Sequence, residues 1–214
     1  MSLENDLQVA DRGPVEAETA APPAGNPLGL GLMTFLPAGL TLGLWFVGYL
    51  DTTDLPGGMI PICALSAGVF MLIAAVWAAS LRANTVAAVL ALFSAFWLTF
   101  AVLLAGITGG WWGISAAGVA NVQRTYLLSF LIVFAFLTAI TLRLPIVFTT
   151  AFLFVTATFV LAFIGVSSGN TGGMFPIAGV TTFIFVALFA YILADGIRQD
   201  LGARPLPMGN PIIR

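Results

Sequence analysis

The sequence predicts an all-α integral membrane protein with six transmembrane helices. Hydrophobic residues make up 60% of the chain and charged residues only 7%, and the mean hydropathy is +1.07, whereas about a quarter of the residues in soluble domains are charged. A transmembrane helix needs about 20 apolar residues, so a chain of 214 residues has room for six spans and for no separate soluble domain. We expect a leader (1–25), a six-helix transmembrane domain (26–196) and a short cytoplasmic tail (197–214).

Residues 1–25 form an acidic leader that its composition predicts to be disordered and cytoplasmic. A secretory signal needs a basic start and a short apolar core, and neither is present. The leader ends where Asn26 and Pro27 predict the start of a helix, because asparagine is a preferred N-cap residue and proline suits the first helical position. The charged residues of the leader are Glu4, Asp6, Asp11, Arg12, Glu16 and Glu18.

The first three spans are predicted from apolar runs at residues 28–50, 59–81 and 85–107. The break at 51–58 combines helix-stopping proline and glycine with two carboxylates, Asp51 and Asp54. A short turn at 82–84 separates the next two runs. After the third run comes the pair Trp111 and Trp112, which is typical of a lipid headgroup boundary.

The last three spans are predicted at residues 126–142, from Pro145 to about 166, and at 174–194. Arg143 and Pro145 indicate a tight turn between the first two of these spans. Glycine-rich residues 167–173 indicate the next loop. The return to water is marked by Asp195, Arg198, Asp200 and Arg204.

The basic residues predict the orientation, because short loops rich in Lys or Arg stay in the cytoplasm. All seven basic residues are arginines, and in a six-span chain only Arg124 falls on the side opposite the termini. We therefore expect both termini to be cytoplasmic, in a multi-pass protein of the plasma (inner) membrane. The arginines on the side of the termini are Arg12, Arg82, Arg143, Arg198, Arg204 and Arg214.

Ionisable groups are missing from all six predicted membrane cores, where such groups usually mark ion paths or catalytic sites. The chain has no histidine and a single cysteine, Cys63. We therefore expect no enzyme activity, no metal site, no cofactor, no nucleic-acid partner and no proton relay through side chains. The side chains left to line a path are aromatic, or neutral and polar, and the latter include Thr34, Thr41, Ser66, Asn84, Ser94, Thr99, Ser129, Thr156, Thr158 and Thr181.

Residues 26–32 read Asn-Pro-Leu-Gly-Leu-Gly-Leu, and Met33 and Phe35 follow in the same span. Further short motifs lie in order along the remaining spans and the tail: Gly48-Tyr49, Asn84-Thr85, Phe96-Trp97-Leu98-Thr99, Tyr126, Thr141-Leu142-Arg143, Gly165, Gly169-Asn170 and Leu206-Pro207-Met208-Gly209. Together they resemble the acetate uptake transporter family of acetate/succinate-proton symporters, whose first span opens with Asn-Pro-Ala-Pro-Leu-Gly-Leu. In this chain Leu28 and Gly29 stand in place of the central Ala-Pro.

The resemblance implies a homo-hexameric ring in which each six-helix protomer has its own narrow path for a short monocarboxylate. It also implies a constriction in that path at Phe35, Phe93 and Val155. The family commonly has tyrosine where this chain has Phe93. Where the family has a polar run before Phe96, this chain has the mostly apolar residues 91–95. Where the family commonly has Gln and Glu in the second span, this chain has Leu72 and Ala79.

The first helix offers a place for a carboxylate, because unsatisfied N–H groups at a helix N-terminus favour anions. We expect it to be held at the cytoplasmic mouth, with Asn26 as cap and Thr34 nearby. A short carboxylic acid has a pKa close to that of a glutamate side chain, roughly 4.3, so it can cross a dry constriction with its own proton. The expected substrate-binding set is Asn26, Pro27, Leu30, Gly31, Leu32 and Thr34.

Three functions of different classes remain open. The first is transport of a short carboxylate such as acetate, coupled to a proton that the substrate carries. The second is a passive channel for a small neutral solute such as urea, an amide or ammonia, because the polar positions lost from the second and third spans leave a more apolar path. The third is a membrane scaffold that transports nothing.

Overall fold

The structure is a computed structural model that describes residues 25–49 and 58–213. The predictions for the leader up to residue 24, for the break at 51–57 with Asp51 and Asp54, and for Arg214 lie outside the described residues.

Six helical segments of the described residues are long and apolar enough to cross a membrane, as the sequence predicts. The second segment is compound, since a π-helix interrupts it. Short 3-10 turns η2 (Trp111–Gly113) and η3 (Ala116–Gly118) join the third segment to the fourth. The six segments are α1 (Pro27–Phe46), α2 (Met59–Pro61) with η1 (Ile62–Val69) and α3 (Phe70–Ser80), α4 (Asn84–Thr108), α5 (Val119–Thr141), α6 (Ile146–Ser168) and α7 (Thr171–Asp200).

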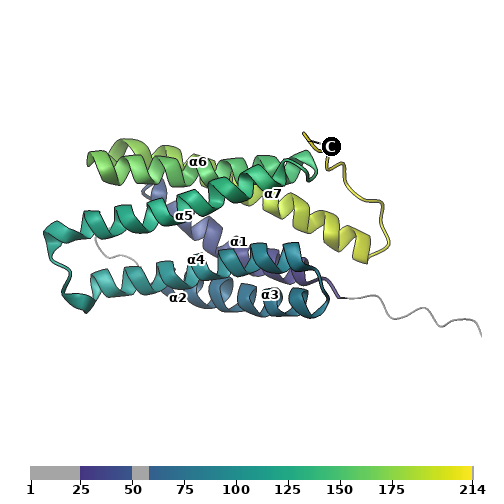
Figure 1. Ribbon diagram of the computed structural model, residues 1–214, viewed down its shortest axis with the longest axis horizontal. Helices are drawn as coiled ribbons and strands as arrows, with labels where there is room; N and C mark the ends of the chain where they lie inside the picture. Colours follow the sequence, from purple (N-terminus) through teal and green to yellow (C-terminus); the bar gives the residue numbers. More distant parts are fainter. Residues whose placement is uncertain (1–24, 50–57, 214) are drawn as a thin grey trace, which may run out of the picture.

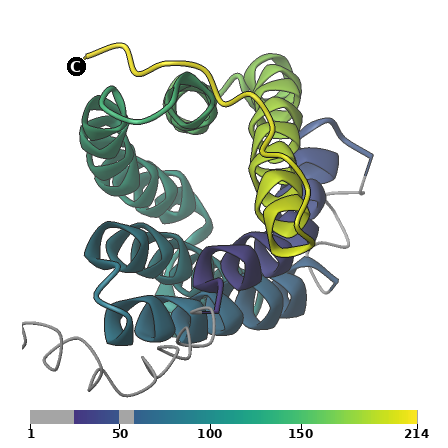
Figure 2. The same cartoon turned by 90° about the vertical axis from the view of Figure 1, so that its right-hand side faces the viewer.

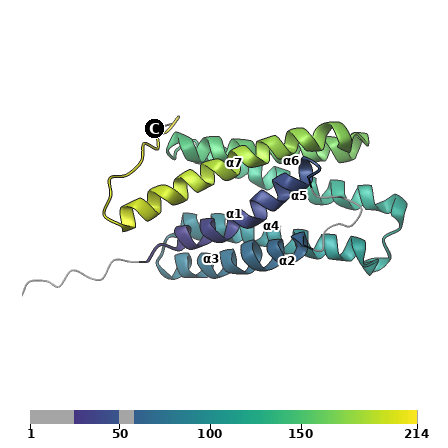
Figure 3. The ribbon, with the colours of Figure 1, turned by 180° about the vertical axis from the view of Figure 1, so that it is seen from behind.

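The helices run along the long axis of the molecule, and α1 crosses obliquely between α7 and α3 (Figures 1 and 3). Seen end on, α4, α5, α6, α7 and α1 surround a common centre, and the second span lies outside α1 and α4 (Figure 2). The contacts between helices agree with this arrangement around the centre. Helix α1 packs on α7, α3 and η1, and α6 packs on both α5 and α7.

The start of α1 and the end of α7 lie at the same end of the bundle, which we call the terminal end (Figures 1 and 3). The turns from α3 to α4 and from α5 to α6 also lie there. Of the arginines in the described helices and turns, Arg124 stands near the start of α5 at the opposite end. The exposed pair Trp111 and Trp112 also lies at that opposite end, as an interfacial pair would. The arginines at the terminal end are Arg82, Arg143, Arg198 and Arg204.

Helix ends differ from the prediction at three places. The first helix stops at Phe46 although the apolar run continues, because Gly48 takes a left-handed conformation with φ of 77°. Helix α5 begins at Val119, well before the predicted start at Tyr126, through a polar stretch that the sequence suggested was a loop. Helix α7 runs from Thr171 to Asp200, beyond the predicted 174–194 at both ends.

Close approach of α1 and α7 depends on glycines. A Cβ atom at Gly39 would lie 2.7 Å from Val186, and one at Gly43 would lie 2.7 Å from Phe183. From the other side, a Cβ atom at Gly179 would lie 2.5 Å from Val47. Small residues on α1 therefore serve packing within the chain, which is how they commonly act between membrane helices.

Hydroxyl groups connect several helices. Thr138 on α5 and Thr156 on α6 share a 2.8 Å hydrogen bond, and Thr158 on α6 and Thr181 on α7 share one of 2.7 Å. Ser94 on α4 donates to the carbonyl of Gly68 in the π-helix at 2.8 Å. Several of the neutral polar residues that we expected to line a path therefore join helices, and Thr158 does so while also lining a cavity.

Residues 201–213 form a C-terminal strap across the terminal end of the bundle. The buried Asp195 carboxylate accepts a hydrogen bond from the backbone N–H of Leu206 at 2.6 Å. The N–H groups of Ile212 and Ile213 donate to the carbonyl of Leu142 at 3.1 and 3.0 Å. The strap thus connects the end of α7 to the turn between α5 and α6.

Candidate functional site

Two of the cavities in the described part of the chain lie inside the bundle. The distal cavity, of about 70 Å³, is lined from the helix ends opposite the terminal end, including Trp45 on α1, Gln123 on α5 and Phe175 on α7. The proximal cavity, of about 80 Å³, is lined from the terminal end, including Leu28 on α1 and Phe148 on α6. Since about 10–15 Å³ of such volume holds one water molecule, each cavity is large enough for a solute of a few non-hydrogen atoms.

Phe35 and Phe93 separate the two cavities, because these two side chains line both of them. Their ring centroids lie 5.6 Å apart in an edge-to-face arrangement, and the side chains are 1% and 5% exposed. Val155 lines the distal cavity and is 2% exposed. The structure thus brings two of the predicted constriction residues into contact and places the third in the wall on the distal side.

Further aromatic rings hold this Phe35–Phe93 partition in place. Phe189 on α7 lies with its ring centroid 5.3 Å from that of Phe35 and 5.8 Å from that of Phe93. Phe134 on α5 lies 5.1 Å from Phe93, and Trp97 on α4 lies 6.0 Å from Phe35. Three of these four contacts are edge-to-face and the Phe93–Phe134 contact is tilted. Such contacts favour a defined arrangement of the rings, so the partition is closed by mutually packed groups.

The cavity walls are apolar, and all the described residues that line them are uncharged. In the distal cavity the Tyr126 hydroxyl donates to the Phe96 carbonyl at 2.9 Å and lies 3.1 Å from the hydroxyl of Thr99. Thr158 donates to the Phe154 carbonyl at 2.9 Å. Polar groups in the proximal wall come from Thr85 and Thr141.

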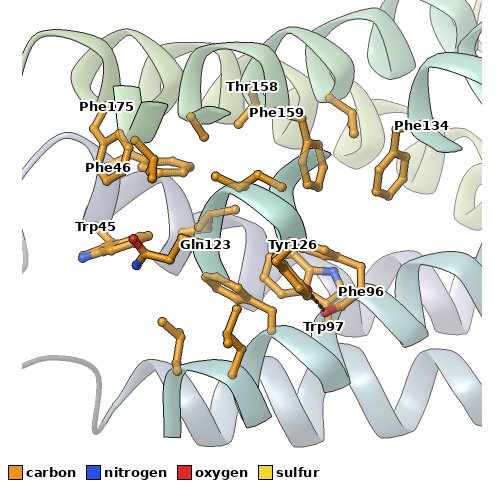
Figure 4. A pocket seen from close by; sticks show the side chains of 18 of the residues that line it. Trp45, Phe46, Phe96, Trp97, Gln123, Tyr126, Phe134, Thr158, Phe159 and Phe175 are labelled. Atoms are coloured by element: carbon orange, nitrogen blue, oxygen red, sulfur yellow. Dashed lines mark hydrogen bonds between the residues drawn. The ribbon is translucent and has the colours of Figure 1, made fainter. Parts of the chain in front are cut away.

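Two tryptophans of the distal cavity have a buried indole nitrogen without a hydrogen-bond partner in the described part of the chain. These are Trp45 and Trp97. In Figure 4, Trp45 and Gln123 lie toward one end of the cavity and Trp97 lies with Phe96 and Tyr126 toward the other. In the sequence, Trp97 was noted only as part of the Phe96-Trp97-Leu98-Thr99 motif and Trp45 was not noted, because an aromatic residue in an apolar run is most often a packing residue.

The start of α1 is capped as predicted. The Oδ1 atom of Asn26 accepts a hydrogen bond from the N–H of Gly29 at 2.8 Å. Its Nδ2 atom lies 3.4 Å from Oδ2 of Asp200, at the end of α7. A carboxylate of the protein itself therefore stands beside the helix end where we expected a carboxylate of the substrate.

The other predicted binding residues lie at different places on α1. Leu32 lines the proximal cavity, whereas Pro27 is buried and Leu30 is half-buried. Gly31 packs against α4, where an added Cβ atom would clash with the side chain of Leu90. The Thr34 hydroxyl donates to the carbonyl of Leu30 at 3.0 Å, so it bonds within its own helix.

Gln123 and Leu28 are further lining residues that the sequence analysis did not identify as such. Gln123 fell in a stretch that was expected to be a loop, and it enters the distal wall because α5 starts at Val119. Leu28 stood out only as a departure from the family motif. Within the described residues, no group of three or more His, Cys, Asp or Glu side chains could hold a metal ion.

Comparison with known proteins gives matches of two kinds. Residues 12–200 match the GPR1/FUN34/yaaH family. The fold matches a solved structure described as the bacterial acetate channel SatP, with a TM-score of 0.76 and 25% sequence identity, over 86% of this chain and 99% of that one. No curated protein matches the sequence significantly.

Proposed function

Because the chain belongs to the GPR1/FUN34/yaaH family, we propose that it moves acetate or a similar short monocarboxylate across a membrane. The family match and the likeness to SatP confirm the resemblance to acetate uptake transporters that the sequence shows. One observation of this chain carries the proposal: two cavities on opposite sides of the molecule meet at a single pair of rings, Phe35 and Phe93. A path of this shape suits a small solute that waits in one cavity, passes the partition and leaves through the other.

The proton crosses on the substrate in this proposal. A bare carboxylate between apolar walls costs several kcal/mol or more, and the described residues of both cavities offer it no cation. A protonated acid avoids most of that cost, and a short carboxylic acid can carry a proton because its pKa is close to that of a glutamate side chain, roughly 4.3. Uptake then accompanies a proton without a protein base.

The α1 start contributes the cytoplasmic mouth of this path. Leu28 and Leu32 lie in the proximal wall, directly after the Asn26 cap. The proximity of Asp200 to Asn26 disfavours a second negative charge there, so this mouth receives the acid more readily than its anion. We propose that the remaining predicted residues, Pro27, Leu30, Gly31 and Thr34, shape this helix start.

The surroundings proposed for the molecule follow from charge and from exposed apolar surface. The arginines gather at the terminal end, which supports cytoplasmic termini in a plasma membrane. Helix α5 buries little of its surface within the protomer, and its exposed side chains include Ile132 and Phe136, at 62% and 67%. Such a face suits lipid or a neighbouring protomer, and we propose a homo-hexameric ring.

A second candidate is passive passage of a small neutral solute such as urea, an amide or ammonia. The observation that favours it is the apolar lining of both cavities, which contains few hydrogen-bonding side chains. In this reading the Phe35–Phe93 partition excludes ions, and no proton accompanies the solute.

Uptake of labelled acetate into proteoliposomes separates these functions. Accumulation above the outside concentration when an inward proton gradient is imposed, after subtraction of protein-free vesicles, supports proton-coupled transport. Equilibration without accumulation supports a passive channel. Absence of any protein-dependent flux in a correctly folded preparation would refute transport and leave the scaffold function.

A further inference from the structure

Trp97 has an unusual position in the distal cavity. It is 1% exposed, and its indole N–H is buried with no hydrogen-bond partner in the described chain. Buried polar side-chain groups almost always have a partner, and the N–H of a buried tryptophan usually finds one. Trp97 also lines the distal cavity, so a solute that displaces the side chains covering this nitrogen can supply the missing acceptor.

None of the neighbouring hydroxyls accepts a hydrogen bond from this N–H in the described chain, and each donates its own proton elsewhere. The Tyr126 hydroxyl donates to the Phe96 carbonyl at 2.9 Å. The Thr158 hydroxyl donates to the Phe154 carbonyl and is shared with Thr181. Among these groups, the Trp97 N–H is the donor without a hydrogen-bond partner in the described chain. It lies at the partition end of the distal cavity, with its ring centroid 6.0 Å from that of Phe35.

The chemistry of this donor defines its ligand. An indole N–H donates one hydrogen bond and accepts none, so it selects a solute with an oxygen or nitrogen acceptor. The surrounding rings of Phe35, Phe96 and Phe100, at centroid distances of 6.0, 4.9 and 6.3 Å from Trp97, offer only apolar contact. A small molecule with an acceptor at one end and a methyl or short alkyl group at the other matches both features.

We propose that the Trp97 indole N–H binds a carboxyl oxygen of the substrate on the distal side of the partition, and so orients the substrate for passage. This inference rests on the proposed transport of a short carboxylate. The N–H can donate to a carboxylate oxygen, more strongly, and to the carbonyl oxygen of the protonated acid, so the same residue serves a substrate that gains or loses its proton in the cavity. Ammonium, which only donates, gains nothing from it.

Trp45 provides an internal comparison. Its indole nitrogen is also buried without a partner in the described chain, but it lies toward the other end of the cavity, away from the partition (Figure 4). The assignment to Trp97 rather than Trp45 follows from the contact of Trp97 with Phe35, which Trp45 does not share.

The test is an NMR titration of the full-length protein in nanodiscs, with ¹⁵N in the indole rings. The chain has five tryptophans, so five indole signals are expected, and they can be assigned through single Trp→Phe variants. Addition of sodium acetate is expected to move the Trp97 signal downfield in a saturable way, whereas sodium chloride at equal ionic strength leaves it in place. If the Trp97 signal stays still while the same protein carries acetate in proteoliposomes, the inference is wrong and the proposed function stands.

A flux measurement gives an independent readout. Trp97→Phe keeps an aromatic ring and removes the N–H, so the half-saturation concentration for acetate is expected to rise about two- to tenfold, the effect of one lost hydrogen bond. Trp77→Phe is the matched control, because Trp77 lies on α3, is 36% exposed and lines neither cavity. An unchanged half-saturation in well-folded Trp97→Phe overturns the inference, and absence of acetate flux in the unaltered protein overturns the proposed function together with it.

Discussion

Replacing Phe35 by alanine is expected to open the partition and raise acetate flux. The Phe35 ring contacts four aromatic rings, those of Phe93, Trp97, Phe185 and Phe189, at centroid distances of 5.6, 6.0, 6.1 and 5.3 Å. Each contact contributes about 0.5–1.5 kcal/mol, so displacing the ring for a passing solute costs roughly 2–6 kcal/mol. Removing even the lower figure from the barrier increases the rate about 30-fold.

The assay is initial uptake of labelled acetate into proteoliposomes at matched protein content, with protein-free vesicles subtracted. Because a buried Phe→Ala change costs about 3–5 kcal/mol of stability, Phe35→Leu is measured beside it. Phe183→Ala is the control, since Phe183 is a half-buried phenylalanine of α7 that lines neither cavity. Acetate flux that is unchanged in folded Phe35→Ala and Phe35→Leu would refute the reasoning that this ring closes the path.

Three further predictions concern charge, packing and pH. Asp200→Asn removes the negative charge beside Asn26. It should lower the half-saturation concentration for acetate about two- to fivefold at low ionic strength, and high salt should abolish this effect. No change at low salt would mean that the substrate does not approach this helix end. Gly179→Ala should lower the free energy of unfolding by about 1–3 kcal/mol, measured by thermal unfolding, because the new methyl group meets Val47. Gly172 lies in open space on the same helix, so Gly172→Ala should not have this effect. Equal effects of the two changes would contradict the packing argument. If the acid crosses with its proton, uptake at fixed total acetate should fall about tenfold from pH 6 to pH 7, as the protonated fraction does above roughly 4.3, and a flat profile would point to passage of the anion.

The six spans could be predicted from the sequence because each is a long apolar run, but the helix ends depend on details that hydropathy does not contain. The first run stays apolar through Val47, and only the left-handed Gly48 ends the helix. Polar residues led the prediction to start the fourth span too late, although Asn121 and Gln123 are compatible with a helix that extends beyond the apolar core. Asp195 suggested a return to water, yet its carboxylate is buried by a bond to the strap.

The candidate site could be predicted less completely. Phe35 and Phe93 were identified through the family resemblance, since nothing in the sequence alone distinguishes them among 18 phenylalanines. Their contact, and their place between two cavities, depend on how α1 and α4 are rotated about their axes. The same holds for Trp97, because a donor without a partner becomes visible only once every neighbouring acceptor has been placed.

The C-terminal strap has a practical consequence for anyone who engineers this protein. Ile212 and Ile213 hold the Leu142 carbonyl, and Met208 accepts a hydrogen bond from Val147 at 3.3 Å, next to Phe148 in the proximal wall. A fluorescent reporter or affinity tag fused after residue 213 would therefore disturb hydrogen bonds that lie next to the wall of the proximal cavity. Any variant with a shortened strap should therefore be assayed as a change in the wall of the proximal cavity.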